Sequence, residues 1–239
     1  MKILEKISWS SLAAPCAVLI FSAIVSGMAA PSFAAAPSPQ TRILVDTSRL
    51  TLETFLSDPE NDAFRDLLKK AEGILIFPQK IKGAFVLGAK GGNGILLVRD
   101  RRSDTWNGPA FYTMGGISIG LQAGGSVSEV ILLIMTQRGI ASLMASSIKL
   151  GAHVSVAAGP VGGGVSAETA NLSADILSFA KAKGVYGGVS LSGAVVSVRS
   201  GMNRAYYGRQ VANADILILR SITSPHSRDI ISLVTAAAR

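Results

Sequence analysis

The side chains best suited to bind a ligand in this sequence are lysines and arginines gathered in two stretches. The first group is Lys80, Lys82, Lys90, Arg99, Arg101 and Arg102. Asp100 is the one acidic residue between positions 76 and 102. The second group is Lys181, Lys183, Arg199, Arg204, Arg209, Arg220 and Arg228, opposed by Asp215 and Asp229. Such cations each contribute about 1 kcal/mol near an anionic membrane; the alternative is a solvated surface whose charge aids solubility.

The predicted turns bring part of the first group together. Lys80 and Lys82 fall in one connection between strands, and residues 99–102 fall in the next connection but one. Alternate connections of an antiparallel meander lie at the same end of the sheet, so we predict one patch there. A preceding amphipathic helix adds three cations on its flanks, Arg65, Lys69 and Lys70. The first basic group and these three helix residues together are the predicted lipid-binding set.

A second motif suggests nucleophilic chemistry. Gly116-Ile117-Ser118-Ile119-Gly120 matches the nucleophile elbow of serine hydrolases, for which Asp175 or Asp215 and His226 follow in the required order. That elbow needs a strand before the serine and a helix after it, whereas Leu121–Gly125 is poor helix sequence. We therefore favour a Gly-rich strand and no catalytic residue. With one cysteine and two histidines, we also predict no metal site and no cofactor.

Composition and the N-terminus limit the class of protein. The 239 residues carry a net charge of +8, and their hydrophobic share of 49% is too high for a disordered chain. Residues 1–36 resemble an export signal, with Lys2 and Lys6 before an uncharged run and small residues at the cleavage site. We predict export to the periplasm or cell envelope, and an uncleaved N-terminal anchor is the alternative.

The remaining chain is predicted to be a linker over residues 37–45 and a single domain over residues 46–239. Helical spacing occupies residues 46–72, short Val/Ile/Leu-rich runs separated by glycines follow, and a final helix covers residues 228–237. The predicted fold class is α+β: N-terminal helices, then a Gly-rich, strongly coiled antiparallel sheet or barrel with short additional helices. Residues 185–198 are read as one strand of the last hairpin, with a bend at Gly193.

The second N-terminal helix has a marked apolar face. Phe64, Leu67 and Leu68 recur at spacings of three and four residues. One hypothesis is that these side chains contact a membrane, as in interfacial amphipathic helices. The alternative is that they pack on the sheet, which is the commoner role of such a face.

An ordered set of short motifs resembles a known family. The segments are Ala71-Glu-Gly-Ile-Leu-Ile-Phe-Pro78, Gly108-Pro-Ala-Phe-Tyr112, Gly120-Leu-Gln-Ala-Gly124, Ser128-Glu-Val-Ile-Leu132, Asp175-Ile-Leu-Ser178, Gly184-Val-Tyr-Gly-Gly-Val-Ser-Leu191 and Asn203-Arg-Ala-Tyr-Tyr-Gly208. In this order they are similar to the SYLF lipid-binding domains, particularly the exported bacterial members. The resemblance covers about residues 47–220.

This resemblance implies a non-enzymatic domain that binds phosphoinositides and other anionic phospholipids. Fungal relatives also bind actin, which for an exported chain is an expectation by analogy alone. The alternative function is an envelope scaffold that binds a protein partner. Nucleic acid is not an expected partner, because the chain has no recognised reader motif or dense basic helix.

Overall fold

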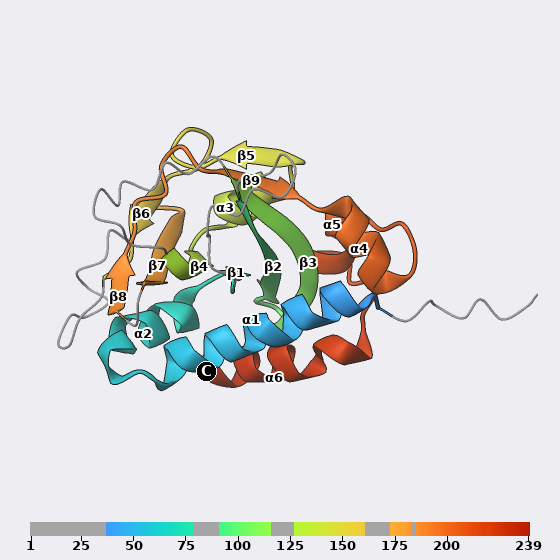
Figure 1. Ribbon diagram of the computed structural model, residues 1–239, viewed down its shortest axis with the longest axis horizontal. Helices are drawn as coiled ribbons and strands as arrows, with labels where there is room; N and C mark the ends of the chain where they lie inside the picture. The colour runs from blue at the N-terminus through green and yellow to red at the C-terminus, as the bar shows by residue number, and fades with distance from the viewer. Residues whose placement is uncertain (1–36, 79–90, 116–126, 161–172, 183–184) are drawn as a thin grey trace, which may run out of the picture. The chain divides into compact units, whose positions relative to one another are not determined.

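The computed structural model describes residues 37–78, 91–115, 127–160, 173–182 and 185–239. The chain divides into two units, Met1–Phe33 and Ala34–Arg239, and all described residues belong to the second. That unit confirms the predicted α+β class: a curled, mostly antiparallel half-barrel sheet with helices before it, after it and between its strands (Figure 1).

The described strands form one sheet in the order β5-β9-β3-β2-β1-β4-β7-β6, and β8 also pairs with β7. Their bounds are β1 Gly73–Phe77, β2 Gly91–Asp100, β3 Thr105–Gly115, β4 Val127–Ile134, β5 Ser147–Lys149, β6 Val156–Ala158, β7 Ile176–Ala182, β8 Val185–Gly188 and β9 Val195–Val198. The described pairings between these named strands are antiparallel except β6 with β7, which is parallel. The central strand β1 is buried along its whole length, as expected for a continuous apolar run without alternation.

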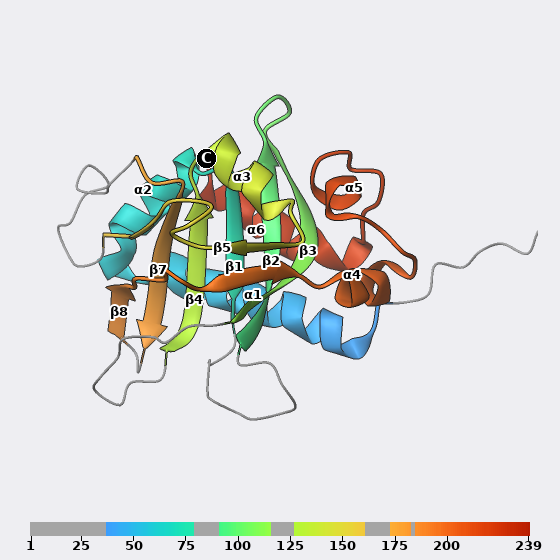
Figure 2. The ribbon, with the colours of Figure 1, turned by 90° about the horizontal axis from the view of Figure 1, so that it is seen from above.

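The helices cover both faces of this sheet. Their bounds are α1 Pro39–Ser57, η1 Pro59–Asn61, α2 Asp62–Lys70, α3 Gln137–Leu143, α4 Ser200–Tyr207, α5 Asn213–Leu217, η3 Pro225–Ser227 and α6 Arg228–Ala237. Figures 1 and 2 show α1 and α6 side by side across one face, while α3, β5 and β9 lie on the opposite side. The C-terminal helix has the predicted bounds, since its apolar residues Ile230 and Val234 recur at helical spacing and are buried.

Glycines allow close backbone approach where the sheet curls. A Cβ added at Gly94 would lie 2.4 Å from the carbonyl oxygen of Ile76 on the neighbouring strand, closer than atoms can approach. Any other residue at this position would push β1 and β2 apart, so the glycine permits their pairing. Gly193 has a φ of +89°, which confirms the predicted bend and favours glycine there.

Two predicted boundaries were wrong. The first helix begins at Pro39 rather than near Asp46, because Leu44 and Val45 pack in the core and proline fits a first turn. Residues 39–45 are therefore helix and not linker. The expected single strand over residues 185–198 is two strands: β8 pairs with β7, whereas β9 crosses the sheet to pair with β3 and β5.

Candidate functional site

Two predicted arginines lie where the β2–β3 hairpin meets the end of α2. Arg99 donates from Nη1 to the carbonyl oxygen of Lys69 at 2.7 Å, and Arg101 donates from Nη2 to that of Lys70 at 2.6 Å. The last carbonyls of a helix lack partners within the helix, so these guanidinium groups satisfy the end of α2. We name the set Lys69, Lys70, Arg99, Arg101, Arg102 and Arg220 the hairpin surface.

Carboxylates neutralise most of this hairpin surface. Arg99 donates from Nε to Asp104 at 2.8 Å, and Arg101 donates from Nε to Glu72 at 3.1 Å. Arg220, 120 positions away in sequence, forms an ion pair with Asp100. The backbone N–H of Arg102 first, then the Ser103 hydroxyl and the Arg220 guanidinium, hold the pKa of Asp100 below its usual value. These arginines are therefore engaged in holding the hairpin, α2 and the C-terminal segment together.

Two of the flanking cations of α2 are also bound to groups within the protein. Arg65 donates from Nη1 to the carbonyl oxygens of Leu56 at 3.0 Å and Asp58 at 2.6 Å, and also pairs with Asp62. Lys69 pairs with Asp66 at 3.1 Å. Within the described residues, Lys70 and Arg102 are the members of the predicted set that are exposed without an ion pair.

The other predicted cations, Lys80, Lys82 and Lys90, lie outside the described residues. Their described neighbours, Pro78 and Gly91, lie at the opposite end of β2 from Asp100, because β1 pairs directly with β2. The prediction that Lys80 and Lys82 share one patch with residues 99–102 rests on a segment outside the described residues and stays a prediction.

The apolar face of α2 is part of the core. Phe64, Leu67 and Leu68 have no exposed surface, and the Phe64 ring lies 5.2 Å from that of Phe179 on β7. Their membrane contact is corrected to packing, since α2 would have to leave the sheet to present them. The helical spacing was right, but the sequence alone does not say which surface an apolar face meets.

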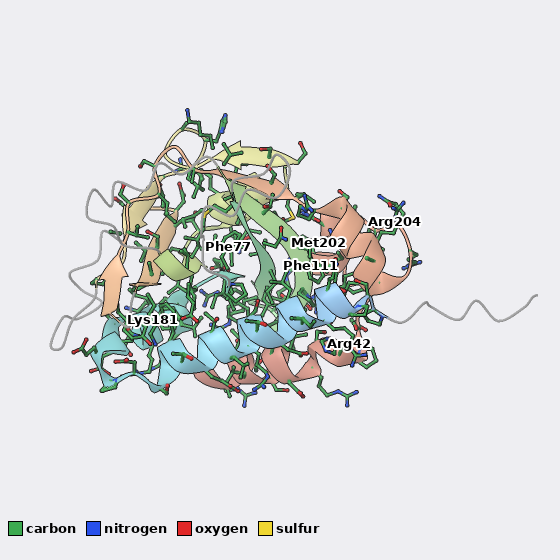
Figure 3. All side chains as sticks on the ribbon, viewed as in Figure 1. Arg42, Phe77, Phe111, Lys181, Met202 and Arg204 are labelled. Atoms are coloured by element: carbon green, nitrogen blue, oxygen red, sulfur yellow. The ribbon has the colours of Figure 1, made fainter. Side chains whose placement is uncertain are left out.

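A second cluster of arginines gathers around α4. We name it the arginine end; it consists of Arg42, Arg199, Arg204, Arg209 and Arg228. All five are exposed, and none forms an ion pair with a described carboxylate. Figure 3 shows Arg42 on α1 and Arg204 on α4 at the same end of this unit, with Lys181 at the other.

Buried hydrogen bonds fix the position of α4, around which the arginine end lies. The amide oxygen of Asn203 accepts from the backbone N–H of Phe111 at 2.8 Å, and the Tyr207 hydroxyl donates to the carbonyl oxygen of Pro109 at 2.8 Å. Burial raises the pKa of Tyr207, so its hydroxyl stays protonated and donates. The backbone N–H of Ser38 donates to the carbonyl oxygen of Ala205 at 3.0 Å, which brings the start of α1 and hence Arg42 to α4.

Sequence reasoning found four of these arginines as part of the second basic group but missed Arg42. It was missed because the prolines at positions 37 and 39 were interpreted as a linker. The signal for it was present: Leu44 and Val45 continue the buried face of α1 upstream of the predicted start. A helix through residue 42 places Arg42 on the opposite, solvent-facing side.

The residues proposed for a hydrolase have other partners. Ser118 lies outside the described residues. The Nε2 atom of His226 lies 3.2 Å from Asp46, and its Nδ1 atom lies 3.2 Å from the Tyr206 hydroxyl. Asp175 instead binds Arg138, and Asp215 accepts from the backbone N–H of Ala212. Neither predicted acid is thus the partner of the histidine.

Comparison with known proteins identifies the family. A family model described as "Ysc84: Las17-binding protein actin regulator" matches residues 115–237, just over half of the chain. The chain belongs to this family of generally non-enzymatic binding proteins, which confirms the SYLF resemblance at family level. Among the described residues, no helix is long and apolar enough to cross a bilayer.

Curated relatives agree with this assignment. Protein YSC84 of Saccharomyces cerevisiae is 28% identical over 177 residues, which is 72% of this chain and 37% of that protein. LAS seventeen-binding protein 3 of the same yeast is 31% identical over 147 residues, 60% of this chain and 32% of that protein. The human SH3 domain-containing YSC84-like protein 1 is 30% identical over 153 residues, which is 63% of this chain and 44% of that protein. The chain thus spans about a third to a half of these relatives' length.

Proposed function

We propose that this protein binds anionic phospholipid surfaces, including phosphoinositide-like headgroups, without catalysing a reaction. The observation that supports the proposal is the arginine end, with five exposed guanidinium groups and no described carboxylate paired to any of them. A guanidinium binds phosphate through parallel hydrogen bonds, and pairing within the protein would occupy the same donors.

The expected strength follows from the number of cations. Each Lys or Arg near an anionic membrane contributes about 1 kcal/mol, so five together suffice for binding, whereas one or two do not. Two nearby acids have hydrogen-bonding partners of their own: Asp46 lies 3.2 Å from Nε2 of His226, and Asp215 accepts from the backbone N–H of Ala212 at the start of α5.

The second candidate function is binding of a protein partner. The family description names Las17 binding and actin regulation, which we carry to this chain only as a proposal. One structural observation favours a protein contact: Ile43 and Leu50 are 59% and 52% exposed on the same face of α1. A membrane-independent partner would use such a face without requiring the arginine end.

Export to the cell envelope is part of the proposal for residues 1–36. Mass spectrometry of the N-terminus in the mature protein tests it. A chain that begins near Pro37 supports cleavage, whereas an intact Met1 in the membrane fraction supports the uncleaved anchor.

Vesicle co-sedimentation tests the lipid proposal. Residues 34–239 form one compact unit with its own core, so the tested protein begins at Pro37 and lacks the apolar leader. We expect binding to phosphatidylglycerol-containing vesicles that weakens with salt, and none to phosphatidylcholine vesicles. Arg42→Gln with Arg204→Gln should weaken binding about thirtyfold, since two cations at about 1 kcal/mol each are lost.

The matched control removes two cations elsewhere. Lys149→Gln with Lys181→Gln changes the net charge by the same amount on strands β5 and β7. We expect a change of less than about threefold, because only long-range attraction is altered. Equal losses of vesicle binding in both variants would show that only the net charge matters and not the arginine end. Absence of binding by the unmodified protein would overturn the proposal in favour of a protein partner.

A further inference from the structure

We propose that the turn after α5 inserts Ile218 and Leu219 into the membrane interface. This inference rests on the proposed lipid-binding function and adds to it the apolar element that penetrates the bilayer. The two side chains are 48% and 67% exposed, whereas the preceding residues Ile216 and Leu217 are each 1% exposed. The chain thus changes abruptly from core to solvent while it remains strongly apolar.

Hydrogen bonds hold this exposed pair in place. The backbone N–H of Leu219 donates to the carbonyl oxygen of Ala214 at 2.8 Å, and the backbone N–H of Ser221 donates to the carbonyl oxygen of Asp215 at 2.9 Å. Arg220 adopts a φ of +54°, in the left-handed region that is uncommon for residues other than glycine. A frayed end would show neither feature, so the turn presents its two aliphatic side chains in a fixed geometry.

The ion pair of Arg220 fixes the same turn from the other side. Its guanidinium binds Asp100 and lies 3.4 Å from the Ser103 hydroxyl, both at the tip of the β2–β3 hairpin. The pairing also compensates the charge of Asp100, which would otherwise repel an anionic surface. Arg102, exposed and without an ion pair among the described residues, lies in the same hairpin tip.

The position of α5 connects this turn to the arginine end. Figures 1 and 2 both show α4 and α5 at one end of the described unit, and α1 begins there as well. Exposed aliphatic side chains next to exposed cations are the combination found in interfacial membrane-binding segments. The cations would attract the anionic headgroups, and the aliphatic pair would then enter the interface.

The other exposed apolar pair fits this role less well. Ile43 and Leu50 lie two turns apart on α1, about 10 Å along the axis. Asp46 lies between them on the exposed face and Glu53 follows within one turn, so this face brings carboxylates toward the surface. The turn after α5 has no carboxylate among residues 216–221.

A single protein partner explains the turn less well than a bilayer. Stable protein interfaces bury about 800 Å² per partner around a packed apolar centre. Ile218 and Leu219 are two adjacent side chains beside charged groups, which is enough for shallow insertion but a small part of such an interface. We therefore assign the lipid interface as the occupant.

The experiment measures partition of residues 37–239 into phosphatidylglycerol-containing vesicles and compares two double variants. Ile218→Ser with Leu219→Ser should weaken partition about tenfold, since two partly immersed aliphatic side chains are lost. The control, Ile43→Ser with Leu50→Ser, removes equally exposed aliphatic groups and should change it less than about twofold. Circular dichroism checks that both variants retain the fold.

Tryptophan fluorescence gives an independent measure of insertion. The tested residues contain one tryptophan, Trp106, which is buried, so Leu219→Trp adds a single surface reporter. Vesicles of brominated phosphatidylglycerol should quench Leu219→Trp and leave Leu50→Trp unquenched.

The outcomes separate this inference from the proposed function. Vesicle binding that is unchanged in the Ile218/Leu219 variant, with an unquenched Leu219→Trp, overturns the insertion and leaves electrostatic binding intact. Loss of binding in the Ile43/Leu50 control alone assigns insertion to α1 and also overturns it. If the unmodified protein binds no vesicle, both proposals fail together.

Discussion

The hairpin surface and the arginine end contain the same kinds of side chain, but the fold uses them differently. In the hairpin surface, Arg99, Arg101 and Arg220 bind carboxylates, and the first two also bind the last carbonyls of α2. In the arginine end, five guanidinium groups are exposed without such a partner among the described residues. The difference teaches that a count of cations does not locate a binding surface, because pairing decides how many remain available for a ligand.

The largest expected effect tests whether the apolar face of α2, next to the hairpin surface, packs in the core of the domain. Phe64→Ala should lower the free energy of unfolding by about 3–4 kcal/mol, because a fully buried aromatic ring that contacts Phe55 and Phe179 is removed. Urea denaturation measures it. If Phe64 served membrane contact, the variant would keep its stability and lose vesicle binding, which would reverse our correction for α2.

The second prediction takes the most buried carboxylate that pairs with an arginine. Asp175 is 2% exposed and accepts from Arg138 at 2.5 Å and from the Ser155 hydroxyl at 2.6 Å. Arg138 first, and then the hydroxyls of Ser155 and Thr136, hold the pKa of Asp175 far below its usual value. Asp175→Asn should cost about 2–3 kcal/mol at neutral pH, since charged hydrogen bonds are replaced by neutral ones.

The same carboxylate gives a pH dependence with a definite sign. A lowered pKa in the folded state means that its stabilisation is complete above about pH 4 and is lost as the pH falls toward the folded value. The difference in the free energy of unfolding between the unmodified protein and Asp175→Asn should therefore shrink as the pH falls from about 4 to about 2. A gap that stays constant over this range would show that the charge of Asp175 contributes nothing.

The third prediction compares an arginine from each region directly. The side chain of Arg99 is only 9% exposed. Arg99→Ala should lower the free energy of unfolding by about 2 kcal/mol, because Asp104 and the Lys69 carbonyl lose a hydrogen-bond partner. Urea denaturation in parallel with Arg204→Ala checks the comparison. Equal losses in the two variants would remove the distinction between the hairpin surface and the arginine end.

The smallest expected effect belongs to the arginine end itself. Arg204→Ala should change the free energy of unfolding by less than about 0.5 kcal/mol, as is usual for an exposed residue without specific contacts. It should nevertheless weaken anionic vesicle binding several-fold at low salt, and less at high salt. A stability loss without a binding loss would assign Arg204 to the support of α4, where it also lies in the last turn of the helix.

Much of the fold follows from local patterns. The bounds of α6 and the helical spacing of Phe64, Leu67 and Leu68 were predicted because apolar spacing acts over a few residues. The contacts of Arg99 and Arg101 with the carbonyl oxygens of Lys69 and Lys70 were not predicted. The acceptors are backbone carbonyls, which carry no sequence signature.

The sequence by itself determined the family, the α+β class and the excess of basic residues. Only the tertiary structure decided which cations are neutralised, since Arg220 meets Asp100 across 120 positions and Arg101 meets Glu72 across 29. It also decided that Phe64 faces the core while Leu219, equally apolar, faces solvent. The physical reason is that ion pairing and burial depend on which segments the sheet brings together, and a pattern of a few residues does not contain that information.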